Sequence, residues 1–466
     1  MMDLDFDFER LKTFITEESF EKLLTDIFVG NIQRQRLSRL RSLYIFFIMC
    51  KCRLADISLD LTPFFDTVDN IAGHLSLNEC TLYKDLAEIY ARLATFNKSK
   101  IFKVLERMTR GQSANILWFL LRDKIITGST LEPFIRTQIL RTSMSDLTTT
   151  LTPWLVFGKR HEPVVKNILE TLIIKAPEPV PGGLGLLLEP NSGIFGASLD
   201  LCYGIHEDQD NLVFSDKIQI YEIKCKCGLL YDSLDQGIQA FLKAPSKEAF
   251  VDIIKEATFP LIEFRPDGQN PSSGTYLISH DPCFDIKRKR RLIYESSDFV
   301  RRLLIHNQNV QSTVWVLDVT ETPDDLTVKL IANFSVRAFF NFRHRYYHQI
   351  LTQYFVTTQL YIEDHPCPEG ISPDNLPTVH IVTALFRTNT KHLDIRVNET
   401  QYKECEIPFL IIITPVRLLV DCVASTIRVA AFAYKQKLKR ETGIEIWESD
   451  FLSGFISSHV VRPPTP

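Results

Sequence analysis

Hydrophobic residues recur at helical spacing through the first part of the chain. Residues 37–49 form one apolar helical pattern, and residues 81–96 form another, in which Leu82, Leu86 and Ile89 lie on one face. Neither segment carries a motif with an evident chemistry. We therefore expect residues 1–135 to form an N-terminal helical lobe that serves as scaffold.

Beyond residue 135, helical patterns alternate with β-type alternation, which predicts an α/β core over residues 136–466. A helix is expected from about Lys159, with a buried stripe that includes Val165, Ile168 and Leu169. Residues 228–310 are less regular and are expected to form an insertion. The remaining pattern predicts strands over residues 193–204, 218–227, 314–319, 327–334, 378–386 and 409–414, and helices after residue 345 and over residues 417–439.

The strand predicted at residues 218–227 holds two charges in an otherwise apolar pattern. Glu222 and Lys224 are two residues apart and therefore share one face of the sheet, whereas Ile223 points to the other face. Burying a carboxylate and an ammonium is costly unless they serve each other or a ligand. This pair is the first candidate for a functional site.

Two polar residues lie on the preceding predicted strand. Ser198 and Asp200 share one face, and the polar turn at residues 206–211 then returns the chain to the strand that holds Glu222. Residue 211 is midway between Asp200 and Glu222. An antiparallel hairpin therefore places these carboxylates roughly opposite each other, and a β-bulge would shift that register.

Glu162 and Gln349 are the candidates on helices. Glu162 lies three residues before Val165, on the buried stripe and in the first turn of its helix. An acidic side chain there either belongs to a site or complements the helix dipole. Gln349 and Gln353 are four residues apart on one face of the helix after residue 345, and Gln349 is placed to steady a water or a phosphate oxygen.

Carboxylates beside a lysine suit metal-dependent phosphodiester hydrolysis. Mg²⁺ prefers oxygen ligands, and Asp200, Glu222 and the backbone carbonyl of Ile223 would supply one site. Lys224 would orient or deprotonate the attacking water, or neutralise developing charge, and Glu162 would orient a metal-bound water or complete a second site. As a spacing alone the pattern is weak, because a surface hairpin with an ion pair has the same residues.

Residues 108–118 contain a Gly turn that leads into a helix, with Arg110 before it and Ser113 near its N-terminus. Backbone N–H groups at such a terminus, together with these two side chains, can hold an anion. The alternative is an ordinary N-cap.

Composition narrows the setting of this chemistry. The net charge of -4 does not indicate a nucleic-acid partner, so any basic surface must be local. One such segment is Lys287, Arg288, Lys289, Arg290 and Arg291, which either follows a nucleic-acid backbone or is a solvated loop or import signal. The ten cysteines form no Cys-x-x-Cys, which favours free thiols in a reducing compartment. An acidic N-terminus and short apolar runs predict a soluble intracellular protein with no membrane partner.

Several motifs together resemble those of the herpesvirus alkaline nucleases, a family that shares the PD-(D/E)xK fold with lambdoid phage exonuclease. They are Gly158-Lys-Arg-His-Glu162, Gly193-Ile-Phe-Gly-Ala-Ser-Leu-Asp-Leu-Cys202, Ile220-Tyr-Glu-Ile-Lys-Cys225 and Tyr346-Tyr-His-Gln349. Met108-Thr-Arg-Gly-Gln-Ser113 most resembles the gammaherpesvirus branch, the DNase and host-shutoff exonucleases. The family's Pro before the Asp is Leu199 here, on the face turned away from the expected site. The long insertion before Gln349 makes that residue's match less direct.

The resemblance implies a restriction-endonuclease-like central mixed sheet flanked by helices. It implies a Mg²⁺-dependent 5′→3′ exonuclease that acts on linear double-stranded DNA at alkaline pH, with Mn²⁺ as a substitute metal. By motif match, Asp200 and Glu222 are metal ligands and Lys224 is the catalytic lysine.

The same match assigns Glu162 as the motif's helical acid. It assigns Arg110, Ser113 and Ser198 to a 5′-phosphate pocket. The basic run from Lys287 to Arg291 would then cross the substrate groove.

The resemblance also implies partners. The enzyme would resolve branched replication products with a viral single-stranded-DNA-binding protein, and in the gammaherpesvirus branch it also cleaves messenger RNA, in the host nucleus and host cytoplasm. An alternative from another class is a non-catalytic RNA- or protein-binding factor on a nuclease-like fold, and a third is a nuclear interaction protein. Intact Asp200, Glu222 and Lys224 favour the nuclease.

Overall fold

The computed structural model describes a large part of the chain. The described residues are 106, 109–112, 118, 122, 125–139, 153–175, 180, 183–190, 193–208, 211–226, 235–256, 261–264, 271–279, 298–321, 326–365, 373–386, 407–442, 452, 455 and 456. Most of the lobe expected at residues 1–135 lies outside them, as do Ser113 and the basic run from Lys287 to Arg291.

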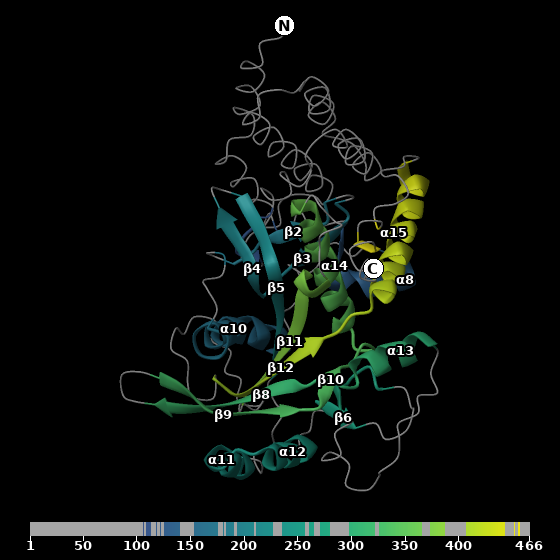
Figure 1. The fold of residues 1–466 in the computed structure, drawn as a ribbon. Coiled ribbons are helices and arrows are strands. Elements are labelled where there is room, and N and C mark those ends of the chain that lie inside the picture. Colours follow the sequence, from purple (N-terminus) through teal and green to yellow (C-terminus); the bar gives the residue numbers. More distant parts are fainter. Residues whose placement is uncertain are drawn as a thin grey trace, which may run out of the picture.

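A six-stranded mixed sheet forms the centre of the molecule, in the order β4-β5-β11-β12-β8-β9 (Figure 1). Strand β5 pairs antiparallel with β4 and parallel with β11, and the other neighbours are antiparallel. This arrangement confirms the expected α/β class. The strands are β4 (Leu201–Asp208), β5 (Asn211–Lys226), β8 (Ser312–Glu321), β9 (Leu326–Val336), β11 (Thr378–Phe386) and β12 (Pro408–Val416).

Different helices cover the two faces of this sheet. On one face, α10 (Pro153–Ile168) and a π-helical turn, η2 (Leu169–Ile173), pack Phe157 and Val165 against Ile223 and Val382. On the other face lies α14 (Tyr346–Asp364), which is buried at every position from Ile350 to Ile362. Such a helix is apolar around most of its circumference because it has protein on every side.

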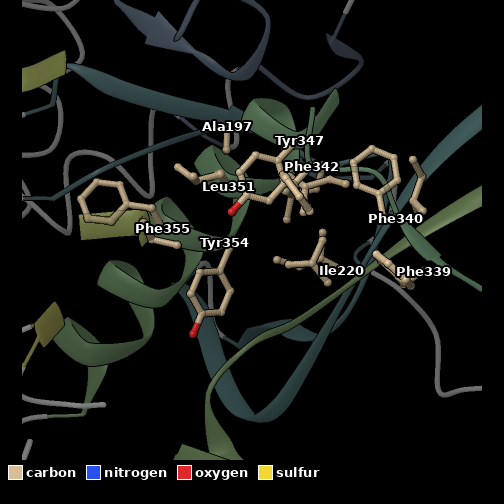
Figure 2. Packing of buried hydrophobic residues seen from close by; sticks show 14 of the residues in the cluster. Ala197, Ile220, Phe339, Phe340, Phe342, Tyr347, Leu351, Tyr354 and Phe355 are labelled. Carbon is tan, nitrogen blue, oxygen red and sulfur yellow. The ribbon is translucent and has the colours of Figure 1, made fainter. Parts of the chain in front are cut away.

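The second surface of α14 contacts a small sheet of order β1-β3-β2. These strands are β1 (Ile126–Thr127), β2 (Leu186–Leu188) and β3 (Phe195–Ser198). Figure 2 shows Tyr347, Leu351 and Phe355 of α14 packed with Ala197 of β3 and Ile220 of β5. The helix is therefore held between two sheets, and its side chains have little freedom to move.

The segment that sequence predicted as less regular contains several helices and strands. These and the remaining elements are α8 (Gly128–Thr137), α11 (Asp235–Lys243), α12 (Lys247–Glu256), β6 (Ile262–Phe264), β7 (Leu277–Ser279), α13 (Asp298–Asn307), β10 (Ala338–Phe340), a short 3₁₀ helix (Pro373–Asn375) and α15 (Val420–Thr442). Strands β10, β7 and β6 make a third sheet, and α11 and α12 lie beside β8 and β9 (Figure 1). Among the described residues, no helix is long and apolar enough to span a membrane.

The strand expected at residues 193–204 is two strands in two different sheets. Strand β3 ends at Ser198 and β4 begins at Leu201, so Asp200 lies in the bend between them. The expected hairpin register holds at this end, because Leu201 pairs with Tyr221 and Cys202 with Ile220. Continuing that register by one residue places Asp200 beside Glu222.

A bulge separates this register from that of the hairpin tip, where Asp208 pairs with Asn211. It lies between Tyr203 and Ile205, and Gly204 there has a φ of +83°. A Cβ at Gly204 would lie 2.9 Å from the Cα of Ile218, so both the dihedral angle and the close approach require glycine.

Helix α10 begins at Pro153, six residues before the predicted start at Lys159. Proline suits the first helical position, because an N–H at that position would have no partner within the helix and its absence costs nothing. The prediction was wrong because Gly158 interrupts the helical pattern, yet it lies inside the helix.

Gly128 and Gly158 give a matched test of packing at this centre. A Cβ at Gly128 would lie 2.6 Å from the Cα of Gln349, whereas a Cβ at Gly158 would have no atom within 4 Å. We expect Gly128→Ala to lower the free energy of unfolding by about 1–3 kcal/mol because α8 and α14 must separate. Gly158→Ala should raise it by up to about 1 kcal/mol through helix propensity. Urea unfolding followed by circular dichroism measures both, and equal values for the two variants would contradict the close packing of α8 on α14.

Candidate active site

Glu222 lies at the centre of the site, on β5, with a side chain that is fully buried. The ammonium of Lys224 donates to Glu222 Oε1, so the two residues share a face as the alternation predicts. Ile223 packs on the opposite face with α10. A carboxylate at this depth is stable only if its oxygens accept hydrogen bonds.

Two glutamines of α14 supply the other donors. Gln349 Nε2 donates to Glu222 Oε1 at 2.5 Å, and Gln353 Nε2 donates to Glu222 Oε2 at 2.5 Å. Gln353 Nε2 also donates to the backbone carbonyl of Ser198 at 3.0 Å, which ties the end of β3 to the site. Sequence reasoning gave a role only to Gln349. The signal for Gln353 was its position four residues further along the same face of the helix.

Asp200 reaches the same strand from the bend between β3 and β4. Its Oδ2 accepts the backbone N–H of Ile223 at 2.8 Å. Burial raises the pKa of the Asp200 carboxyl well above its usual range, and the Glu222 and Glu162 carboxylates raise it further. In an extended strand the N–H and C=O of one residue point to the same side. The Ile223 carbonyl therefore also points toward Asp200, at the edge where β4 has not yet begun.

Glu162 comes to the site from α10. Burial raises the pKa of its carboxyl, the Lys224 ammonium lowers it, and the Glu222 carboxylate raises it again. These interactions put Glu162 within electrostatic range of Glu222 and Lys224. Because α10 begins at Pro153, Glu162 also lies inside the helix and not in its first turn, where it was expected. The structure thus brings together Glu162, Asp200, Glu222, Lys224 and Gln349.

Lys224 remains an ammonium in this environment. Burial lowers its pKa, but the Glu222 and Asp200 carboxylates raise it by more, so the net shift is upward. Its Nζ lies 4.6 Å from the centroid of the Tyr346 ring, a favourable cation–π contact. Burial raises the pKa of the Tyr346 hydroxyl, and Lys224 and Lys226 lower it to a net value of about 8. Sequence reasoning assigned no role to Tyr346, although it begins the motif that contains Gln349.

The charges of the site do not balance. Glu162, Asp200 and Glu222 carry three negative charges when ionised, Lys224 carries one positive charge, and the excess is two negative charges. No group of three or more His, Cys, Asp or Glu side chains within the described ranges could by itself hold a metal ion. Mg²⁺, however, binds through one or two carboxylates and keeps several waters. Asp200, Glu222 and the Ile223 carbonyl fit such an ion and do not fit a structural zinc.

Of the residues assigned to a 5′-phosphate pocket, Ser198 adjoins the site, Arg110 lies on a segment that reaches toward it, and Ser113 lies outside the described residues. Gln112 Nε2 donates to the carbonyl of Leu199 at 2.8 Å, so the segment with Arg110 reaches the bend that holds Asp200. Ser198 Oγ accepts the indole N–H of Trp118 at 2.7 Å.

The guanidinium of Arg110 is bound to two carboxylates. It donates from Nε and Nη2 to the buried Glu106 at 3.2 and 3.1 Å, and from Nη1 to Glu207 at 2.9 Å. A phosphate at Arg110 would therefore have to share or replace the contact with Glu207.

Comparison with known proteins gives this geometry a context. A family model described as viral alkaline exonuclease matches residues 4–452. The chain is 37% identical to the alkaline nuclease of Elephantid herpesvirus 1, over 100% of this chain and 97% of that protein. It is 30% identical to the shutoff alkaline exonuclease of Epstein-Barr virus, over 93% of this chain and 95% of that protein.

A solved structure agrees with the fold. The crystal structure of the shutoff and exonuclease protein from Kaposi's sarcoma-associated herpesvirus superposes with a TM-score of 0.62 at 26% identity. The match covers 89% of this chain and 88% of that one. The same protein has been solved in complex with RNA.

Gln353 allows a test of the donors around Glu222. Gln353→Met keeps the side-chain length but removes the donor to Glu222 Oε2, so we expect a loss of about 1–3 kcal/mol in the free energy of unfolding. The loss should be smaller in a Glu222→Gln background, because a neutral acceptor is less costly to leave unpaired. Denaturant unfolding of the four proteins measures this coupling. Equal losses in both backgrounds would show that Gln353 stabilises the fold without acting through the carboxylate.

Asp200 gives the stability of the metal-free protein a pH dependence of known sign. A carboxyl whose folded pKa is raised binds more protons when folded, so it destabilises the fold as pH rises above the unfolded pKa of about 4. In the presence of a chelator, Asp200→Asn should therefore raise the Tm relative to wild type at pH 8–9. The difference should vanish as pH falls below about 4. A Tm gain independent of pH would contradict the predicted charge repulsion.

Proposed function

Because the chain belongs to the viral alkaline exonuclease family and is a nuclease, we propose that it is a Mg²⁺-dependent alkaline 5′→3′ exonuclease of linear double-stranded DNA with a PD-(D/E)xK core. One observation carries the proposal. Glu222, Lys224 and Asp200 converge on one buried point, where burial and the neighbouring Glu222 carboxylate raise the carboxyl pKa values of both Asp200 and Glu162.

Each residue of the site has a distinct role in this proposal. Asp200, Glu222 and the Ile223 carbonyl would hold Mg²⁺, or Mn²⁺ in its place, and the bound ion would lower the pKa of a water and offset charge on the phosphoryl oxygens. Lys224 remains cationic, so it neutralises negative charge that develops at the scissile phosphate.

Two residues have supporting roles. Glu162, whose raised carboxyl pKa favours proton uptake, takes a proton from the attacking water. Gln349 keeps Glu222 in position through its hydrogen bond to Oε1.

Attack from a chain end requires recognition of the terminal phosphate. We propose that Arg110, Ser113 and Ser198 bind it. The link from Gln112 to the carbonyl of Leu199, next to Ser198, supports a pocket beside the metal site. Terminal binding there would place the first phosphodiester bond at Asp200 and Glu222, and the basic run from Lys287 to Arg291 would follow the backbone further along.

RNA is the second candidate substrate. Lys226 Nζ lies 5.9 Å and the Arg345 guanidinium 5.2 Å from the ring centroid of Tyr346, which is half-buried, whereas the ring of Tyr276 is fully buried and is not available to a base. Aromatic rings interleaved with cations bind single strands with little sequence preference. This cluster adjoins Lys224, so a strand held there would reach the same site and be cleaved internally.

The partners and compartments of the proposal follow from these two substrates. Digestion of branched replication DNA exposes single strands, which favours work beside a viral single-stranded-DNA-binding protein in the host nucleus. Cleavage of messenger RNA, and with it host shutoff, requires presence in the host cytoplasm. The alternative of a non-catalytic binding factor is not supported, since the named relatives are nucleases.

Digestion of a 5′-phosphorylated linear duplex tests the proposal. Wild type should release nucleotides with Mg²⁺ at pH 8–9 and none with a chelator. Glu222→Gln and Asp200→Asn should each lose at least about 100-fold in rate, because each removes a charge that holds the ion. Release of labelled nucleotides from either end measures both rate and direction.

Two results would refute this proposal. The first is digestion in the chelator at an unchanged rate. The second is retention of wild-type rate by Glu222→Gln. Glu132→Gln, which changes a half-exposed carboxylate on α8 that pairs with Arg136, is the matched control for loss of one negative charge, and it should digest DNA at the wild-type rate.

A further inference from the structure

Strand β11 places one hydroxyl beside the catalytic lysine. The parallel register pairs Thr383 of β11 with Lys224 of β5. In the run of residues 381–386, Thr383 is the single polar side chain, and it is fully buried. A hydroxyl at this depth normally has a hydrogen-bond partner.

Thr383 lies on the same face of the sheet as Lys224. Its neighbour Val382 packs with Ile223 on the α10 face, whereas Ile381 belongs to the cluster on the α14 face. Period-2 alternation then directs Thr383 to the α14 face, with Glu222 and Lys224. Adjacent strands are about 4.8 Å apart, so the hydroxyl is within reach of a flexible lysine side chain.

The hydroxyl of Thr383 has no hydrogen-bond partner among the residues that the structure describes. The ammonium of Lys224 is instead bonded to Glu222 Oε1 and lies against the Tyr346 ring. Glu222 cannot serve the ammonium and a divalent cation equally well, because both compete for the same negative charge. When a cation engages Glu222, the ammonium, whose side chain is only 17% exposed, needs another acceptor nearby.

We propose that Thr383 is a positioning residue, which accepts a hydrogen bond from the Lys224 ammonium when a divalent cation engages Glu222. This inference rests on the proposed metal-dependent activity and goes beyond it. Thr383 does not touch the substrate. It gives Lys224 a second defined position, between the neighbouring strand and the Tyr346 ring, from which the charge can face the scissile phosphate.

Binding of Mg²⁺ without substrate provides the first readout. By supplying the ammonium's second position, Thr383 stabilises the metal-bound state and therefore raises the affinity for Mg²⁺. Thr383→Val, which has the same shape without the hydroxyl, should weaken Mg²⁺ binding about tenfold in calorimetry, corresponding to about 1.4 kcal/mol. Thr383→Ser, which keeps the hydroxyl, should restore binding to within about twofold of wild type.

The kinetics of DNA digestion provide the second readout. Thr383→Val should lower kcat about tenfold and leave KM for the duplex within about twofold, because ground-state contacts with DNA lie elsewhere. Thr357→Val is the matched control. Thr357 is also fully buried, and its hydroxyl has no hydrogen-bond partner within the described part of the chain, but it lies on α14. This control should match wild type in Mg²⁺ affinity and in kcat.

The outcomes separate this inference from the proposed function. If Thr383→Val equals Thr383→Ser, or if Thr357→Val loses as much as Thr383→Val, the positioning role is wrong while the nuclease proposal stands. A wild-type protein that neither binds Mg²⁺ nor digests DNA refutes both. If Thr383→Val does not fold, the metal-bound wild-type crystal structure decides. A distance from Lys224 Nζ to Thr383 Oγ1 within about 3.2 Å supports the inference, and a longer one overturns it.

Discussion

The buried carboxylate of Glu222 is the constraint around which the rest of the structure is arranged. A carboxylate without exposure to water is stable only with several donors, and here Lys224, Gln349 and Gln353 provide three. The lysine is local, two residues away on the same strand. The two glutamines come from α14, so this helix must cross the sheet at Glu222 with its amides at the correct height. The close approach of Gly128 to the Cα, Cβ and Cγ of Gln349 helps to fix the helix there.

Asp200 reaches the same point because two sheets meet at the bend before it. Strand β3 belongs to the small sheet and β4 to the large one, and the bond from Gln353 to the Ser198 carbonyl fixes the end of β3. The bend releases Asp200 from strand pairing, so its side chain can turn back and accept the N–H of Ile223. In a single continuous strand, that N–H would instead donate to a backbone carbonyl of the neighbouring strand. The carboxylate would then have no anchor on β5.

The sequence predicted elements and local pairs well, and distant contacts poorly. Strand β11 matches its predicted residues 378–386, because a mostly apolar run that is bounded by turns is compatible with few other structures. Glu222 and Lys224 follow from period-2 alternation alone. The register of Asp200 against Glu222 was also predicted, although the bulge at Gly204 moves the hairpin tip. The contact of Gln353 with Glu222 joins residues 131 positions apart, and no local pattern encodes it. The split of one predicted strand into β3 and β4 likewise depends on which sheet each half joins.

The balance of forces at Glu222 argues that the site is not there for stability. A buried ion pair rarely stabilises a fold more than a well-packed apolar pair of similar volume, because desolvation offsets the attraction. Here Asp200 and Glu162 add two further carboxyl groups whose pKa values are raised by burial, so their ionisation is unfavourable in the metal-free protein. A cation that relieved this repulsion would still have to displace a donor from Glu222. The glutamine donors are held on α14, which is buried from Ile350 to Ile362. Lys224, by contrast, has a flexible side chain and lies beside the Thr383 hydroxyl, which has no hydrogen-bond partner among the described residues. We therefore expect Lys224 to be the donor that moves when the ion binds. Because α14 is rigid, the helix and its glutamines stay in place.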